Sequence, residues 1–351
     1  MCQLSCLDYM NELVIWAHSE CRSNAALYAE VKRLAEAQGL RVTMCLWDEM
    51  PMEESRKSHG LEWIKVGDDL KKGREVLAAH GGADATHVFC VYQNSSVWRR
   101  LIVEAKKSGS RVVVSAEAPC EMCVGLKARL KRLYYRWVLP WRVRGVVKAA
   151  DLFLNASGMN GVDELLRLGW KKEKIVPFGY ASDCGGEVAA DRCSGRVEGA
   201  LHILHTGIET EYRDLATLRR AVDVLRGKGI AVDLACTMGK ASDEEMARLY
   251  GWADVFVACG LCEPWGMRVN DAIHAGLPVV VSDGMGARWL VDQFGCGCTY
   301  PAGDAEALSK ILERIAGDAD FRVRLISGVS AAHAAWTPEA RAKVWLEKVS
   351  D

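Results

Sequence analysis

The sequence predicts an α/β fold made of two doubly wound domains, each built on a parallel β-sheet. The chain has 351 residues, more than the roughly 250 to 300 over which one hydrophobic core grows. Short apolar runs alternate with helical patterns in two separate series, as in βα units. Two such Rossmann-like domains in tandem are expected to face each other across a cleft, because each binds ligands at the carboxyl ends of its strands.

The first domain is expected to span residues 1–180. One of its helices is predicted to end at Gly39 and another at Gly109, since glycine commonly follows the last turn of a helix. Its strands are predicted at Leu13–Ala17, Val42–Trp47, Trp63–Val66, His87–Tyr92, Val112–Ser115 and Leu152–Leu154.

Residues 181–199 are polar, contain glycine and lack apolar periodicity, so they are expected to form a linker. The second domain is expected at 200–330. In the segment 331–351, a helix at about Pro338–Val349 has the length to cross back onto the first domain. The second-domain strands are predicted at Leu201–His205, Ile230–Cys236, Asp254–Cys259, Pro278–Ser282 and Gly297–Tyr300, and its helices at Leu215–Arg226, Ser242–Tyr250, Gly266–Ala275 and Ala305–Ile315. The helix that follows Ser242 carries a capping box, Ser-Asp-Glu-Glu.

Composition restricts the classes of function. Hydrophobic residues make up 50% of the chain, which excludes disorder as its main state. The 45 Lys and Arg against 46 Asp and Glu give a net charge of −1, so no nucleic-acid partner is expected. The 14 cysteines are spread along the chain, and we expect no export signal, so reduced thiols in a cytoplasm are predicted. No apolar run reaches the ~18 residues of a membrane span.

Several common enzyme signatures are missing from the sequence. No G-x-G-x-x-G follows a predicted strand, and no G-x-x-x-x-G-K-[ST] occurs, which disfavours a dehydrogenase or a P-loop ATPase. The sequence also lacks a G-x-S-x-G elbow and an H-E-x-x-H helix, which disfavours the commonest hydrolases.

The most informative segment is Ala258–Gly286, ACGLCEPWGMRVNDAIHAGLPVVVSDGMG. A strand leads into a loop, and a helix begins after the proline in that loop. The backbone N–H groups of Trp265, Gly266 and Met267 would then be available at the positive end of the helix dipole. Such a helix start is a seat for phosphate, and glycine allows close approach of a ligand.

Two carboxylates accompany this predicted phosphate seat. Glu263 precedes the helix and Asp271 lies eight residues further on, so they can accept hydrogen bonds from a polyol at the two ends of a diphosphate-linked ligand. The alternative is an ordinary strand, loop and helix, in which Glu263 only caps the helix and Asp271 lies on the surface.

The same segment resembles the donor-site signature of the family-4 retaining glycosyltransferases (glycosyl transferases group 1) of the GT-B fold. In that family, E-P-[WF]-G-x-x-x-x-E-A opens a helix that is followed by A-G-x-P-V-V-x-S. The resemblance implies that Glu263 contacts the hydroxyls of the transferred sugar and that Asp271 holds the ribose. It extends upstream to Val147–Asp151 and Lys174–Tyr180, and downstream to Gly295–Asp304.

The chain also departs from the pattern of this family. His18–Asn24 replaces the usual glycine-rich first loop, and Gly207, Ile208 and Glu209 replace G-R-L. Arg213 stands near the family's Lys, and Arg268 is the candidate substitute for the missing cation. Between Cys236 and Ser242 the chain omits an α/β unit that many relatives carry.

A basic and aromatic segment runs from Lys127 to Lys148. It contains eight basic residues, no acidic residue, two tyrosines and two tryptophans. Such a face can lie in an anionic headgroup layer, so a peripheral position at the inner face of the cell membrane is predicted. The alternative is a solvated helix pair broken at Pro140 with its aromatic residues packed inward. The candidate membrane-surface residues are Lys127, Arg129, Lys131, Arg132 and Arg136.

Two further groups of residues are candidates for binding. His18 and Glu117 follow strands of the first domain and are candidates for contact with an acceptor, although residues so placed are more often structural. The pairs Cys120-x-x-Cys123 and Cys259-x-x-Cys262 have zinc-ligand spacing, but they fall on different domains, so inert thiols and no metal site are expected.

Together these observations predict a metal-independent retaining glycosyltransferase without a cofactor. It would transfer a sugar from a nucleotide-diphosphate sugar to a glycan or lipid-linked acceptor, in cell-surface polysaccharide biosynthesis. One alternative is a catalytically silent partner protein that binds sugar nucleotides. Another is a glycoside hydrolase that uses Glu263 and Asp271 as acid and nucleophile.

Overall fold

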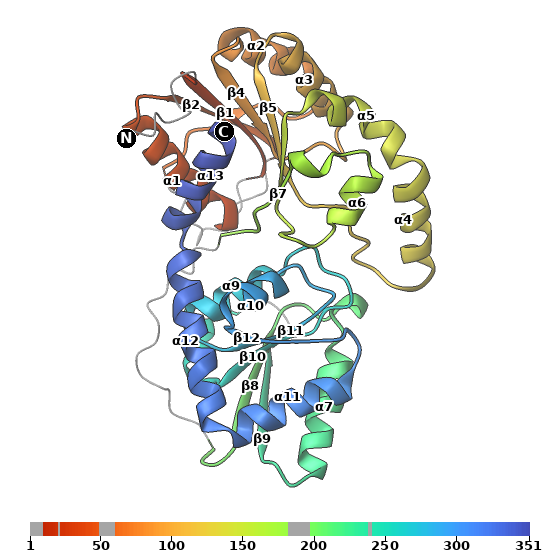
Figure 1. Cartoon of the computed structure of the whole chain (residues 1–351), viewed down its shortest axis with the longest axis vertical. Helices are drawn as coiled ribbons and strands as arrows, with labels where there is room; N and C mark the ends of the chain where they lie inside the picture. Colours follow the sequence, from red (N-terminus) through yellow and green to blue (C-terminus); the bar gives the residue numbers. More distant parts are fainter. Residues whose placement is uncertain (1–9, 20–21, 49–59, 182–196, 238–240) are drawn as a thin grey trace. The chain divides into compact units, whose positions relative to one another are not determined.

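The computed structural model describes residues 10–19, 22–48, 60–181, 197–237 and 241–351. The chain divides into two compact units (Figure 1). Unit 1 comprises Met1–Pro119, Arg129–Ser182 and Pro338–Asp351, and unit 2 comprises Cys120–Ala128 and Asp183–Thr337. Most of the expected linker and part of the expected first loop lie outside the described residues.

Unit 1 is built on a seven-stranded parallel sheet with the order β3-β2-β1-β4-β5-β6-β7. Its strands are β1 (Glu12–Ser19), β2 (Arg41–Asp48), β3 (Ile64–Lys65), β4 (Ala85–Phe89), β5 (Arg111–Ala116), β6 (Leu152–Asn155) and β7 (Ile175–Pro177). Its helices are α1 (Arg22–Ala37), α2 (Leu70–His80), α3 (Ser96–Lys107), α4 (Gly125–Trp137), α5 (Leu139–Ala149), α6 (Val162–Arg167) and α13 (Pro338–Ser350). The first residues of α4 fall in unit 2.

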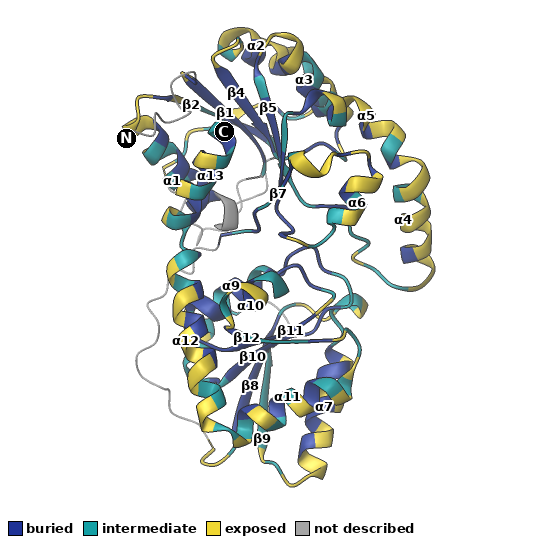
Figure 2. Ribbon diagram, in the orientation of Figure 1, coloured by how far each residue is buried: buried dark blue, intermediate teal, exposed yellow. Residues whose placement is uncertain are grey.

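Hydrophobic cores cover both faces of this sheet, which explains why its central strands read as continuous apolar runs. In β1, the side chains alternate between the two cores, with Val14 and Trp16 in one and Leu13 and Ile15 in the other. Figure 2 shows these central strands as buried.

The C-terminal helix α13 completes one of these cores. It packs against α1, and its fully buried Trp345 is part of the same cluster as the β1 side chains. Arg341 donates a hydrogen bond to the Phe178 carbonyl at 2.6 Å and lies over the Phe178 ring at 4.2 Å. Unit 2 therefore ends at Thr337, beyond the boundary at 330 that the sequence suggested.

Two details of unit 1 differ from the sequence analysis. The three-residue strand β7 was not predicted, because so short a run has no readable period. The break between α4 and α5 falls at Val138, whereas Pro140 lies in the first turn of α5. Proline is tolerated there because that turn needs no N–H donor.

A buried polar chain connects β1 and β4 with the end of α2. The Trp16 indole N–H donates to His87 Nδ1 at 3.1 Å, and His87 Nε2 lies 3.1 Å from the His80 carbonyl. His80 Nδ1 lies 2.6 Å from Glu12 Oε1. These bonds favour neutral His87, with its proton on Nε2. Burial lowers the pKa of His87 to about 4, although the His80 carbonyl and the Glu12 charge act in the opposite direction.

We therefore predict that His87 makes unit 1 sensitive to acid. The pKa of His87 in the folded protein lies below the ordinary 6.5. The stability that neutral His87 contributes is therefore complete above pH 6.5 and is lost as the pH falls toward about 4. The loss should amount to about 2–3 kcal/mol of unfolding free energy. Urea unfolding of wild type and of His87→Gln across this pH range measures the loss. His205 is present in both proteins, so its contribution cancels in the comparison. Equal pH dependence in the two proteins would contradict the prediction.

Unit 2 is built on a five-stranded parallel sheet with the order β12-β11-β10-β8-β9. Its strands are β8 (Leu201–Thr206), β9 (Val232–Thr237), β10 (Val255–Ala258), β11 (Val279–Ser282) and β12 (Gly297–Tyr300). Its helices are α7 (Leu215–Gly227), α8 (Asp243–Trp252), α9 (Met267–His274), α10 (Arg288–Phe294), α11 (Ala305–Gly317) and α12 (Ala319–Ala335).

The capping residue predicted for α8 is confirmed, because Ser242 Oγ accepts a hydrogen bond from the Glu245 N–H at 3.1 Å. The helices α10 and α12 were not predicted. In the described part of the chain, no helix is long and apolar enough to cross a membrane.

Candidate functional site

The candidate site lies where β8 and β10 end side by side in unit 2. The two strands pair in parallel, so the loops after them begin at the same edge of the sheet. The loop after β10 leads to Gly266, the N-cap of α9, whose φ of +107° suits glycine. Glu263 forms a backbone bridge with Met285 in the loop after β11, which holds the entry to α9 in place.

A buried cluster of charges occupies this edge. The carboxylate of Glu263 lies with one oxygen 2.9 Å from Arg268 Nη2 and with the other 3.8 Å from Arg213 Nη2. Glu263 and Arg268 are each only 8% exposed. A lone buried charge is costly, so the carboxylate and the two guanidinium groups stabilise each other. The cluster has one more positive than negative charge.

Backbone carbonyls fix the two arginines on the β8 side. Arg268 Nη1 donates to the Thr206 carbonyl at 2.8 Å, and Arg213 Nη1 donates to the Ile208 carbonyl at 3.2 Å. Gly207, which lies between these two carbonyls, has a φ of +120°. A Cβ at Gly207 would lie 2.9 Å from Arg268 Nη1 and 3.1 Å from Arg213 Nη1. The missing side chain thus makes room for both guanidinium groups.

Each arginine retains an unused donor. The Nε atoms of Arg213 and Arg268 are buried and have no hydrogen-bond partner among the described residues. Buried donors without a partner are rare and cost free energy, so such a group indicates a place where a ligand atom can bind.

The neighbouring His205 is uncharged. Burial, and then the nearby charge of Arg268, lowers its pKa to about 4. His205 Nδ1 lies 2.8 Å from the Val257 carbonyl and 3.5 Å from the Cys259 sulfur. Burial raises the pKa of the Cys259 thiol to about 12. These two side chains therefore add no charge to the cluster.

The other predicted donor residues occupy different environments on α9. The Trp265 side chain is fully buried, donates to Asn270 Oδ1 at 2.8 Å and stacks on Trp336. Any contact that Trp265 makes with a ligand must therefore come from its backbone. Met267 and Asp271 are half-buried, in the first and second turns of the helix.

The predicted acceptor-side residues lie in unit 1. His18, at the end of β1, has its ring centroid 4.7 Å from that of Trp47, at the end of β2. Glu117 follows β5, and its carbonyl accepts a hydrogen bond from Gln93 at 3.1 Å. One strand, β4, lies between β1 and β5, so His18 and Glu117 stand at the same edge of the sheet. Two strand spacings, roughly 10 Å, separate them.

The five predicted membrane-surface residues all lie on α4. Lys127, Arg129, Lys131, Arg132 and Arg136 are exposed. The alternative, in which the aromatic residues pack inward, holds only for the half-buried Tyr134 and Tyr135, which pack against the core. Trp137 and Trp141 are exposed, so for them the inward alternative is wrong.

Both cysteine pairs belong to unit 2, so the expectation that they fall on different domains is wrong. Cys262 Sγ lies 3.6 Å from the Cys123 carbonyl, whereas Cys259 is buried beside His205. Among the residues that the structure describes, no three His, Cys, Asp or Glu side chains are grouped so that they could hold a metal ion.

The sequence did not reveal how the loops fold together. The Thr206 and Ile208 carbonyls that hold the arginines, and Met285 beside Gly266, carry no motif that marks them. Gly207 was noticed only because it stands where the resembling family has the glycine of G-R-L.

The chain has the GT-B fold of two Rossmann-like α/β units. It superposes on HepE from Anabaena, solved in complex with UDP and glucose, with a TM-score of 0.67 over 97% of this chain and 100% of that one. The identity is 13%, so this likeness shows the fold alone.

Residues 234–329, which contain Glu263 and α9, match the sequence model of the glycosyl transferases group 1. The GDP-mannose-dependent alpha-mannosyltransferase of Mycobacterium tuberculosis (strain CDC 1551 / Oshkosh) is 30% identical over 145 residues, 41% of this chain and 35% of that protein. The lipopolysaccharide core biosynthesis glycosyltransferase LpsE of Rhizobium meliloti (strain 1021) is 28% identical over 180 residues, 45% and 52% of the two chains. The match thus spans about a third to a half of these relatives, and it supports a GT-B glycosyltransferase of group 1.

We predict that a methyl group at position 207 disrupts the charge cluster. Gly207→Ala should destabilise unit 2 by about 1–3 kcal/mol, because alanine is strained at positive φ and its Cβ meets both arginines. Gly227→Ala is the matched control, since a Cβ there meets nothing within 4 Å. Thermal unfolding of both variants tests the role of Gly207, and equal stability would contradict it.

Proposed function

We propose that this protein is a metal-independent retaining glycosyltransferase that uses a nucleotide-diphosphate sugar as donor and needs no cofactor. The observation that carries the proposal is the buried cluster of Glu263, Arg268 and Arg213 at the start of α9. The match of residues 234–329 to the glycosyl transferases group 1 supports the same activity.

The cluster suits a diphosphate ligand. Its net positive charge, the two unused Nε donors and the positive end of α9 all favour a doubly charged group. During transfer, the bond between the sugar C1 and the phosphate oxygen breaks, and negative charge grows on the departing diphosphate. Fixed cations at that position stabilise the charge as it develops.

Glu263 has two roles in this proposal. In the structure it holds Arg268 and Arg213 in place, and with donor bound it accepts hydrogen bonds from hydroxyls of the transferred sugar. Asp271, in the second turn of α9, accepts hydrogen bonds from the ribose. Neither residue is proposed as a covalent nucleophile.

The acceptor is proposed to be a glycan or a lipid-linked sugar, in cell-surface polysaccharide biosynthesis at the cytoplasmic side of the membrane. The name of the relative from Rhizobium meliloti, a lipopolysaccharide core biosynthesis glycosyltransferase, supports this class of acceptor. His18 and Glu117, at the carboxyl ends of two strands in unit 1, are the candidate acceptor contacts. A catalytically silent partner protein that binds sugar nucleotides is the alternative, because the first loop and one cation depart from the family pattern.

We predict opposite effects from the two carboxylates. Glu263→Gln should lower turnover by at least about 10²-fold, because a misplaced sugar reacts slowly. Its affinity for nucleotide diphosphate should stay the same or rise, because removing the carboxylate leaves the arginine charge unneutralised. Asp271→Asn should mainly weaken nucleotide binding, since it removes a charged acceptor for the ribose.

Turnover assays and calorimetric titration of both variants separate these effects. Lost nucleotide binding in Glu263→Gln would indicate that the site has collapsed, and unchanged turnover would remove Glu263 from the reaction. Donor binding without measurable turnover in the wild type would favour the silent partner protein.

We also predict that a chelator leaves the initial rate unchanged, because α9 and the arginines supply the positive charge that a metal ion supplies in other transferases. The rate is measured with and without chelator and then after addition of Mg²⁺ or Mn²⁺. Activity that is lost and restored by the metal would contradict this catalytic strategy.

A further inference from the structure

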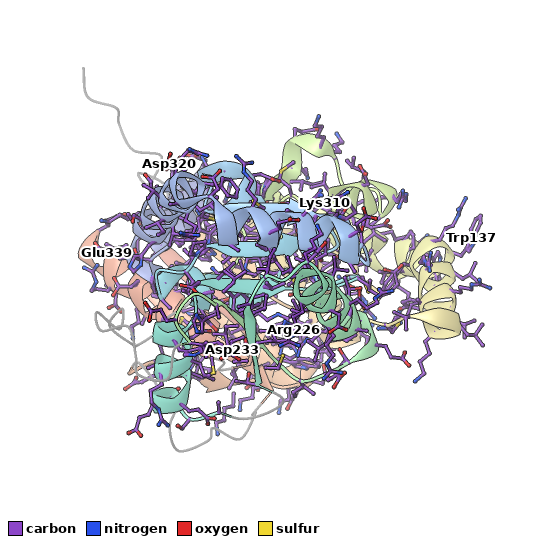
Figure 3. The ribbon with its side chains drawn as sticks, turned by 90° about the horizontal axis from the view of Figure 1, so that it is seen from below. Trp137, Arg226, Asp233, Lys310, Asp320 and Glu339 are labelled. Atoms are coloured by element: carbon purple, nitrogen blue, oxygen red, sulfur yellow. The ribbon has the colours of Figure 1, made fainter. Side chains whose placement is uncertain are left out.

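Helix α4 presents a narrow apolar stripe to solvent. Leu126, Leu130, Leu133 and Trp137 are 71%, 57%, 55% and 70% exposed. Their spacing of four, three and four residues places them within an arc of about 60° on the helix surface. Figure 2 shows α4 exposed along most of its length, and Figure 3 shows the labelled Trp137 side chain projecting outward from it.

The opposite side of α4 faces the protein. Ala128 is buried, and Tyr135 packs against the core of unit 1. The stripe is therefore not a misplaced core face, because α4 already has a separate surface that packs. Four large apolar side chains held together in water are unfavourable unless something covers them.

Cations border the stripe on both sides. At 100° per residue, Lys127 lies on one side, and Arg129 and Arg136 lie on the other, each about 70–90° from the centre of the stripe. The Arg136 guanidinium lies 5.4 Å from the centroid of the Trp137 ring. Lys131 and Arg132 lie further round the helix, toward the protein.

The apolar surface continues beyond the end of α4. Val138 is 44% exposed, and Trp141, in the first turn of α5, is 66% exposed. The Arg144 guanidinium lies 5.6 Å from the Trp141 ring centroid. An exposed indole with a cation beside it is an arrangement that suits the boundary between lipid tails and headgroups.

We propose that α4 is an in-plane membrane helix that inserts Leu126, Leu130, Leu133 and Trp137 among the acyl chains of an anionic bilayer. Lys127, Arg129 and Arg136 then lie at the level of the lipid phosphates. This goes beyond binding by charge alone, because the apolar stripe supplies an attraction that salt does not screen. The proposal does not rest on the proposed enzymatic function.

The charge of the segment selects this occupant over a second copy of the chain. Residues 127–148 contain eight basic residues and no acidic residue. Two such stripes packed against each other would bring rows of like charge together, whereas an anionic bilayer is complementary to both borders of the stripe.

The test is co-sedimentation of the full chain with vesicles, without any substrate. Vesicles of phosphatidylcholine mixed with phosphatidylglycerol should bind the protein, and phosphatidylcholine vesicles should bind it more weakly. High salt should weaken binding to the mixed vesicles but not abolish it, since only the electrostatic part is screened. Complete loss at high salt would overturn the insertion of the stripe.

Variants separate the apolar stripe from the charges. Leu130→Gln with Leu133→Gln keeps every charge and the helix propensity, and should weaken binding roughly 100-fold, at about tenfold per inserted leucine. Val323→Gln is the matched control, because Val323 is 65% exposed on α12 between Arg322 and Arg324, and Ile326 is the only other exposed large apolar side chain described on that helix. The control should bind as wild type does, and equal binding by the double variant would overturn the proposal.

Depth of insertion provides a second readout. Vesicles with brominated acyl chains should quench more of the tryptophan emission in wild type than in Trp137→Leu, which keeps the apolar side chain and so should still bind. Equal quenching in the two proteins would contradict insertion at Trp137. Sedimentation without vesicles tests the alternative occupant, a second copy of the chain. A wild-type dimer that dissociates in the double leucine variant would assign the stripe to contact between two copies and overturn the membrane proposal.

Discussion

The candidate donor site depends on one carboxylate that two guanidinium groups share. Glu263 neutralises only part of the charge of Arg268 and Arg213, so the cluster stays buried and still has a positive surplus. Without the carboxylate, two cations would repel each other in a poorly solvated place. With a second carboxylate, the attraction for an anionic ligand would be lost. One carboxylate for two guanidinium groups avoids both outcomes, which suits a site that must bind and then release a diphosphate.

The fold builds this cluster from segments that are far apart in sequence. Pairing of β8 with β10 brings the turn at Gly207 beside the loop that carries Glu263, and the bridge to Met285 fixes that loop from the β11 side. The φ of +120° at Gly207 then turns the backbone so that the carbonyls on either side of it accept from the two arginines. Residues that bear no charge thus determine where the charges lie.

Much of this fold could be predicted from the sequence, because buried parallel strands are continuous apolar runs between helical patterns. The prediction failed where the pattern is too short, as for the three-residue β7. In the site, the resemblance suggested Glu263, Asp271 and Arg213, and Arg268 was suggested as the substitute for a missing cation. Sequence alone could not show that Arg268 pairs with Glu263, because the contact depends on how a loop of irregular backbone folds against its neighbour. The exposed stripe on α4 was missed for a related reason, since an apolar helical period does not tell which face is packed.

We propose that this cluster in unit 2 binds a nucleotide diphosphate. The most direct measurement is a thermal-shift screen of the wild-type protein against uridine, guanosine and other nucleoside diphosphates, with the matching nucleosides as controls. We expect one diphosphate to stabilise the protein by about 2.7 kcal/mol at roughly 100 times its dissociation constant, and its nucleoside to stabilise it much less. Stabilisation by no diphosphate, or equal stabilisation by the nucleoside, would contradict the assignment of Arg268 and Arg213 to the phosphates.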